Sequence, residues 1–227
     1  MNKDVKPIYF VDDPKIKSIH IDDYEISLDP QKHSIKKTIP THFEKEYLQL
    51  LEASQLNPKG MLEKVLDLKN RCLHSPEIDN LLCYLYIQNK NLAAAEKLIE
   101  QNFFDYPDYF FAKINFADQM LRKKKFSRIK EIFPFDELKN NFKERTHYHV
   151  SEYRSFMVLM SRYHSALRNT EKAYFFYQKA LKADPAHHTV VSLERELYKK
   201  SWGANISRGL HHGLALLLKI KRCFLNN

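Results

Sequence analysis

The stretch that decides the fold runs from Arg154 to Pro185 and reads RSFMVLMSRYHSALRNTEKAYFFYQKALKADP. Apolar and small residues recur there at helical spacing, first in residues 157–164 and again in residues 173–180. The polar pair Asn169-Thr170 separates the two runs, and Pro185 follows the second. This pattern predicts two short amphipathic helices joined by a tight turn, with a proline stopping the second helix.

The same plan recurs along the chain. Further helix pairs are expected at residues 43–71, 75–107 and 108–134, and one more helix at 188–200. When Pro107 is aligned with Pro185, two units begin at Pro76 and Arg154, 78 residues apart. This separation fits two repeats of about 34 residues and an insertion of about 10, which we place within 135–153.

This period resembles the tetratricopeptide repeat, a helix pair of about 34 residues with large apolar, small and proline residues at set positions. In the unit from Arg154 the matching residues are Met157, Met160, Ser161, His164, Ala173, Tyr177, Ala180 and Pro185. In the unit from Pro76 they are Asp79, Leu82, Cys83, Tyr86, Ala95, Ile99, Asn102 and Pro107. The unit from Phe110 matches at Phe116, Ala117, Met120, Ile129 and Phe133, and no unit has the family's tryptophan. Small side chains at these positions let two helices cross closely.

The resemblance implies an all-α fold, a right-handed α-solenoid of helix-turn-helix repeats whose first helices line a concave groove. A groove of this kind binds a peptide or a partner helix. By resemblance, the groove residues are Asn80, Tyr84, Ile87, Gln88, Ile114, Asp118, Leu121, Arg122, Val158, Arg162 and Ser165. We therefore expect a non-catalytic protein-protein interaction scaffold, acting as an adaptor or a chaperone-like carrier.

The two ends of the chain differ from the repeats, so we expect three segments, at 1–42, 43–200 and 201–227. In the N-terminal arm, apolar residues alternate with polar ones on both sides of Asp22-Asp23. This pattern suits either a small hairpin or an extended arm. Residues 201–227 form a basic amphipathic pattern without acidic residues. Such a helix caps the solenoid, enters a partner's groove or lies on an anionic membrane surface.

The formal net charge of +9 is concentrated in two places, around residues 110–150 and at the C-terminus. A basic patch is expected at Arg122, Lys123, Lys124, Lys125, Arg128 and Lys130. Clustered positive charge is typical of proteins that bind nucleic acid or anionic lipid, although such runs are also ordinary solvated helix faces. The alternative function is therefore a basic helical-repeat protein that binds RNA or an anionic membrane surface.

No pattern in the chain indicates an enzyme or a cofactor. The four glycines form neither a P-loop nor a dinucleotide fingerprint, and no GxSxG or HExxH motif occurs. His147 and His149, and the adjacent pairs at 187–188 and 211–212, are better explained as surface or capping residues than as metal ligands. The three cysteines contain no CxxC pair, and the first residues lack an apolar signal-peptide core. Both features favour a cytoplasmic protein.

Overall fold

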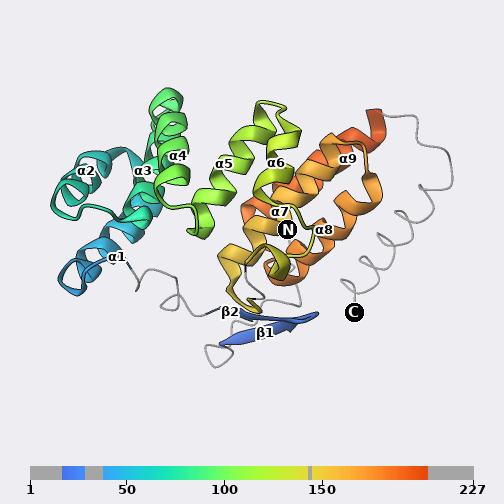
Figure 1. The fold of residues 1–227 in the computed structure, drawn as a ribbon, viewed down its shortest axis with the longest axis horizontal. Helices are drawn as coiled ribbons and strands as arrows, with labels where there is room; N and C mark the ends of the chain where they lie inside the picture. The colour runs from blue at the N-terminus through green and yellow to red at the C-terminus, as the bar shows by residue number, and fades with distance from the viewer. Residues whose placement is uncertain (1–16, 29–37, 143–144, 204–227) are drawn as a thin grey trace, which may run out of the picture. The chain divides into compact units, whose positions relative to one another are not determined.

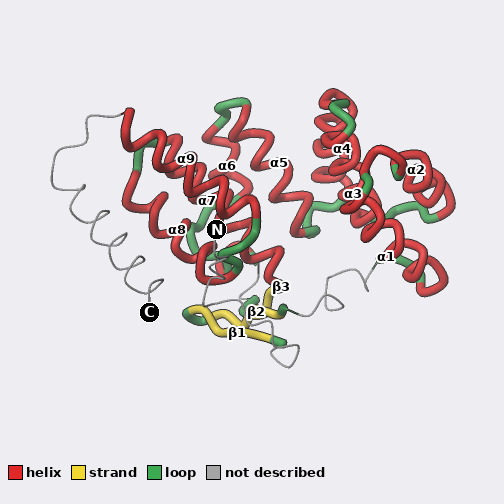
Figure 2. Tube along the Cα trace, turned by 180° about the vertical axis from the view of Figure 1, so that it is seen from behind, coloured by secondary structure: helices red, strands yellow, loops and turns green. Residues whose placement is uncertain are grey.

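The computed structural model describes residues 17–28, 38–142 and 145–203, and the chain divides into two compact units. One unit comprises residues 29–141, and the other comprises residues 1–28 together with 142–227. The described residues are mostly helical, as expected, with one small sheet (Figures 1 and 2).

The unit 29–141 is built from helices in its described residues. They are α1 (Thr41–Leu56), α2 (Leu62–Arg71), α3 (Pro76–Gln88), α4 (Leu92–Asp105), α5 (Phe110–Arg122) and α6 (Phe126–Ile132), with short 3-10 turns η3 (Pro58–Gly60) and η4 (Lys139–Asn141). Helix α3 packs against α2, α4 and α5, and α5 also packs against α6. The buried side chains of this unit include Val65, Leu68, Ile78, Leu82, Leu85 and Ile129.

The other unit joins distant parts of the sequence. It contains β1 (Ser18–Ile21), β2 (Tyr24–Ser27), β3 (His147–His149), α7 (Val150–Ala166), α8 (Thr170–Ala183) and α9 (His188–Gly203). Helices α7 and α8 form a closely packed hairpin, and α9 packs against both. Residues 204–227, which hold most of the expected C-terminal basic helix, lie outside the described residues.

The alternating pattern near the N-terminus forms a hairpin. Strand β1 pairs antiparallel with β2, and Asp22 turns the chain with a φ of 53°. Ile21, Tyr24 and Ile26 are buried. Strand β2 also pairs in parallel with β3, so the sheet order is β1-β2-β3. A lone two-stranded hairpin is marginally stable, and this one is supported by the third strand and by contacts with α7 and α8.

The third strand is a departure from the all-α expectation. Residues 135–153 were expected to be a partly helical connection, and instead they contain η4, β3 and the start of α7 at Val150. Tyr148 is buried against Tyr24, with ring centroids 5.9 Å apart. A strand of three residues has too few positions to show an alternating pattern, so sequence periodicity misses it.

Three helix hairpins share one turn. The connections α3–α4, α5–α6 and α7–α8 each place one residue in the left-handed region, namely Lys90, Lys124 and Arg168, with φ of 62°, 56° and 61°. In each, the next backbone N–H donates to the carbonyl five residues earlier: Asn91 to Tyr86, Lys125 to Met120 and Asn169 to His164. This is the Schellman arrangement that closes a helix end. The helix-turn-helix units predicted from the sequence are therefore present at all three places.

The small residues of the repeat pattern are buried inside these hairpins. Ser161 and Ala173 meet directly, because the Ser161 hydroxyl donates to the Ala173 carbonyl oxygen at 2.7 Å. Cys83 and Ala95 hold the equivalent positions in α3–α4, and both are buried. A larger side chain at either place would push the two helices apart.

Candidate partner-binding site

The first helices α3 and α5 lie side by side and form the candidate site in the unit 29–141. The side-chain amide of Asn115 on α5 donates to the Asn80 carbonyl oxygen on α3 at 2.7 Å. Further along the two helices, Tyr84 and Leu121 are partly exposed, Gln88 is exposed, and Ile87 keeps 38% of its surface accessible. We call the surface formed by Asn80, Tyr84, Ile87, Gln88, Asp118, Leu121 and Arg122 the first-helix face.

The first-helix face has few free charges. The Asp118 carboxylate and the Arg122 guanidinium form an ion pair within α5, with Oδ2 and Nε 3.6 Å apart. The remaining groups are an aromatic ring, two aliphatic side chains and amides. Such a mixture suits a partner that buries apolar surface and hydrogen-bonds its polar groups.

One expected groove residue of this unit, Ile114, is only 6% exposed and belongs to the core. Its neighbour Asn115, which sequence reasoning did not select, makes the bridge to α3. No sequence signal distinguishes the two, because a shift of one position along a helix rotates the side chain by about 100°.

The expected groove residues of α7 lie in the other unit, and two of them are buried or paired with α9. Val158 is 6% exposed. The Arg162 guanidinium makes two hydrogen bonds to the Glu196 carboxylate of α9, at 3.0 and 2.8 Å. Ser165 is partly exposed. Helix α9 therefore occupies the side of α7 where a partner was expected, and Glu196 is a residue that the sequence analysis did not single out.

The expected basic patch is largely balanced by acidic neighbours. Lys123 pairs with Glu96 at 2.7 Å, Lys130 pairs with Asp136 at 3.3 Å, and Arg122 and Arg128 pair with Asp118 and Glu131. Lys124 and Lys125 have no acidic partner among the described residues. The patch thus offers two free positive charges rather than six.

Three of the histidines that were weighed as metal ligands have other partners, and the pair at 211–212 lies outside the described residues. His149 is the N-cap of α7, where its Nδ1 accepts from the Ser151 N–H. His147 pairs with Glu25 of β2 at 3.1 Å. Burial lowers the pKa of His187 to about 4, and its Nδ1 lies 2.8 Å from the Thr189 hydroxyl. In the described part of the chain, no three His, Cys, Asp or Glu side chains gather where they could share a metal ion.

The two described cysteines are unsuited to nucleophilic chemistry. Cys72 and Cys83 are buried free thiols, and burial raises the pKa of Cys83 to about 12. A thiol with a raised pKa is a poor nucleophile at neutral pH, because the thiolate is the reactive form.

Over the described ranges, no helix combines the length and the apolar character needed to cross a membrane.

Comparison with protein-family models, with curated proteins and with solved structures gave no match for this chain. The resemblance to tetratricopeptide repeats therefore depends on the repeat pattern and on the three matching turns alone.

Proposed function

We propose that this chain is a cytoplasmic, non-catalytic scaffold of the tetratricopeptide-like class, an adaptor or chaperone-like carrier that holds a peptide or a partner helix on its first-helix face. The observation that carries the proposal is the exposure of Ile87, Tyr84 and Leu121 on adjacent first helices. Aromatic and aliphatic side chains that remain accessible between polar groups are the usual anchors of a protein interface.

The part of the proposed groove on α7 contributes less. A partner that used Arg162 would first have to displace Glu196 from a two-bond ion pair. Charge-assisted bidentate pairs are among the stronger polar contacts, so this exchange is unfavourable. We therefore assign the main binding role to α3 and α5.

The test uses matched aliphatic-to-lysine substitutions. Ile87 lies in the last turn of α3, and Leu56, which is 83% exposed, ends α1. A lysine suits the C-terminal end of either helix, so both Ile87→Lys and Leu56→Lys preserve the fold. We expect Ile87→Lys, and likewise Leu121→Asp, to abolish capture of the proteins that the wild-type chain retains from cytosol, while Leu56→Lys retains the same set.

The bound proteins are identified by mass spectrometry, and folding is checked by circular dichroism. If all three variants retain the wild-type set, the first-helix face is not the binding surface. Cross-linking from a photoreactive amino acid at Tyr84, with one at Leu56 as its control, then tells a direct partner from an indirect one.

The second candidate function is binding of RNA or an anionic membrane surface, favoured by the two adjacent lysines without acidic partners, Lys124 and Lys125. Binding of this kind weakens steeply as salt rises, because counterions are released from the nucleic acid or lipid. A salt titration separates the two functions. Binding to RNA or to phosphatidylserine vesicles that vanishes with salt and with Lys124→Glu/Lys125→Glu supports the second, and a salt-tolerant protein complex supports the first.

A further inference from the structure

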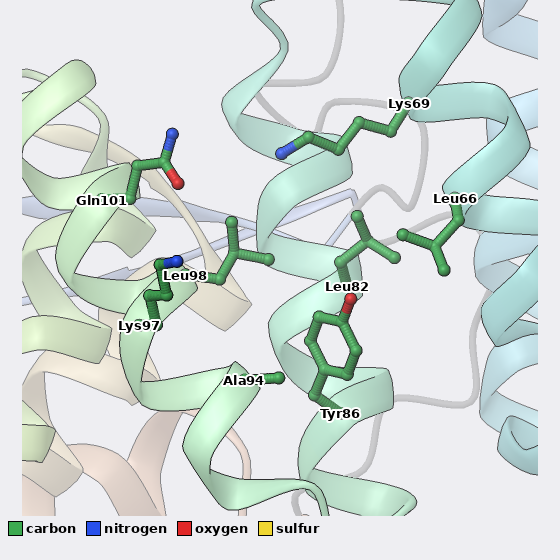
Figure 3. Close-up of a pocket in the computed structure, with 8 residues that line it drawn as sticks. All are labelled: Leu66, Lys69, Leu82, Tyr86, Ala94, Lys97, Leu98 and Gln101. Atoms are coloured by element: carbon green, nitrogen blue, oxygen red, sulfur yellow. The ribbon is translucent and has the colours of Figure 1, made fainter.

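A pocket of about 210 Å³ lies between helices α2, α3 and α4, all in the unit 29–141 (Figure 3). The lining side chains are Leu66 and Lys69 from α2, Leu82 and Tyr86 from α3, and Ala94, Lys97, Leu98 and Gln101 from α4. Figure 3 shows Leu66, Leu98 and the Tyr86 ring approaching Leu82 from three sides. The pocket thus has an apolar interior and a polar rim.

The pocket is distinct from the first-helix face. Successive residues of an α-helix turn by about 100°, so Leu82 and Tyr84 point to nearly opposite sides of α3. Leu82 and Tyr86 line the pocket, whereas Tyr84, Ile87 and Gln88 belong to the first-helix face. A partner bound at one surface leaves the other accessible.

The volume indicates the size of the occupant. Pockets that enclose a whole small molecule usually measure about 300–1,000 Å³. This one is smaller, although it is several times the roughly 30 Å³ that one water molecule occupies in the liquid. It therefore suits a single large apolar side chain better than a complete cofactor.

The rim determines the charge of the occupant. Lys97 is exposed and has no acidic partner among the described residues. Lys69 reaches over the pocket (Figure 3). Its ammonium forms an ion pair with Asp79, and the Gln101 amide donates to Asp105 at 3.3 Å. A carboxylate placed beside the pocket would be attracted by Lys97 and would approach the ammonium of Lys69 as a second acceptor.

From this complementarity we propose that the α2–α4 pocket is a second docking site, which takes one large apolar side chain of a partner protein together with a carboxylate on the same segment. The apolar side chain displaces water from the partly exposed Leu66 and Tyr86, above the buried Leu82 and Leu98, and the carboxylate pairs with Lys97. This proposal is independent of the one for the first-helix face.

The probe for the test is a fluorescein-labelled helical peptide of about 16 residues, long enough to form a helix. It carries one Phe, with Glu four residues to either side, in an Ala/Gln background. Binding to the full chain is followed by fluorescence polarisation. We expect the peptides with Phe→Ala or with both Glu→Lys to bind at least about tenfold more weakly, since an anchor or a charge pair is lost.

The variants of the chain address the pocket directly. Ala94→Phe fills the pocket from α4 and should abolish binding of the probe. Lys97→Glu should weaken binding by about tenfold, because an attraction is replaced by a repulsion. Lys64 is also an exposed lysine, on α2 outside the pocket lining, so Lys64→Glu is the matched control and should leave binding unchanged.

Three results would overturn the proposal: equal binding of the three peptides, no binding of the Phe/Glu peptide, or equal effects of Lys97→Glu and Lys64→Glu. The Lys97 variant keeps the test decisive if Ala94→Phe does not fold. Ile87→Lys separates the two sites, since it should leave the probe bound. Loss of the probe in Ile87→Lys alone would assign the peptide to the first-helix face and reject the pocket.

Discussion

The α3–α4 and α7–α8 hairpins contain the same turn and the same cap, yet their charged groups are held in different ways. Lys90 and Arg168 both adopt positive φ, and Asn91 and Asn169 accept from the backbone N–H three residues ahead, at 3.2 and 3.1 Å. These local features follow from short stretches of sequence that begin and end helices.

The difference lies at the ends of the first helices. In α7, the Glu152 carboxylate is buried, receives two hydrogen bonds from Arg145 at 3.1 and 2.6 Å, and accepts from the His149 N–H. Arg154 and Asp184 form a second ion pair across the hairpin. In α3, the buried Glu77 accepts from the hydroxyls of Thr38 and Ser75 and from its own backbone N–H, and burial raises its pKa.

This contrast teaches that a repeat pattern specifies a hairpin but not the environment of its charges. Helix α7 starts from β3, which brings Arg145 next to Glu152, whereas α3 follows α2 directly. The following experiments test how far the two hairpins are alike.

The largest effect is expected where the two helices cross. Ala173→Leu, and equally Ala95→Leu, should lower the free energy of unfolding by about 3 kcal/mol, because the added atoms have no space between closely packed helices. Urea unfolding followed by circular dichroism measures it. The α5–α6 hairpin is the natural comparison, because the position that matches Ala173 and Ala95 is held there by the buried Ile129. A loss below about 1 kcal/mol in either variant would mean that the helices do not cross tightly.

Breaking the buried ion pair of α7 should have the next largest effect. Glu152→Gln should cost about 2 kcal/mol, because the charge-assisted bonds to Arg145 are lost. Glu171 is an exposed acid in the first turn of α8, so Glu171→Gln is the matched control and should change the unfolding midpoint very little. Similar losses in the two variants would show that Arg145 contributes little to stability.

The caps should be exchangeable between hairpins. Asn169 caps α8 with its side chain, whereas Lys125 at the start of α6 makes no such bond. Asn169→Lys should therefore destabilise by about 1 kcal/mol, and Lys125→Asn should stabilise by a similar amount. Thermal unfolding of both variants checks the prediction. A Lys125→Asn chain that melts at or below the wild-type temperature would contradict the likeness of the turns.

The smallest effect is expected in how the free energy of unfolding depends on pH. Since the folded state raises the pKa of Glu77 above its ordinary value of 4.5, the folded chain holds this proton more tightly than the unfolded chain. The contribution of Glu77 to stability is therefore complete below pH 4.5 and is lost as pH rises through the raised pKa. Glu77→Gln should reduce this fall in the free energy of unfolding with rising pH. Urea unfolding at a series of pH values measures it, and a variant with the same pH dependence as the wild type would contradict the prediction.

Periodicity predicted every long helix in the described residues, although α7 begins at Val150 rather than at Arg154, and it left residues 18–27 open between a hairpin and an extended arm. It succeeded because apolar residues spaced three to four apart, a turn residue and a following proline are all local signals. It missed β3, which is short and takes its support from the distant β2. The resemblance to tetratricopeptide repeats also placed Ile114 and Val158 on an open groove, although both are buried. Burial of one helical position rather than its neighbour depends on the helix packed against it.

The sequence by itself determined which segments form helices, the three matching turns and the small residues buried between paired helices, because these depend on backbone propensity and on contacts within one hairpin. Only the tertiary structure decided that α9 pairs with Arg162, that residues 18–27 join β3, and that a pocket forms between α2, α3 and α4. The physical reason is that these features arise from side chains far apart in the chain, whose approach depends on the packing of whole elements rather than on the order of neighbouring residues.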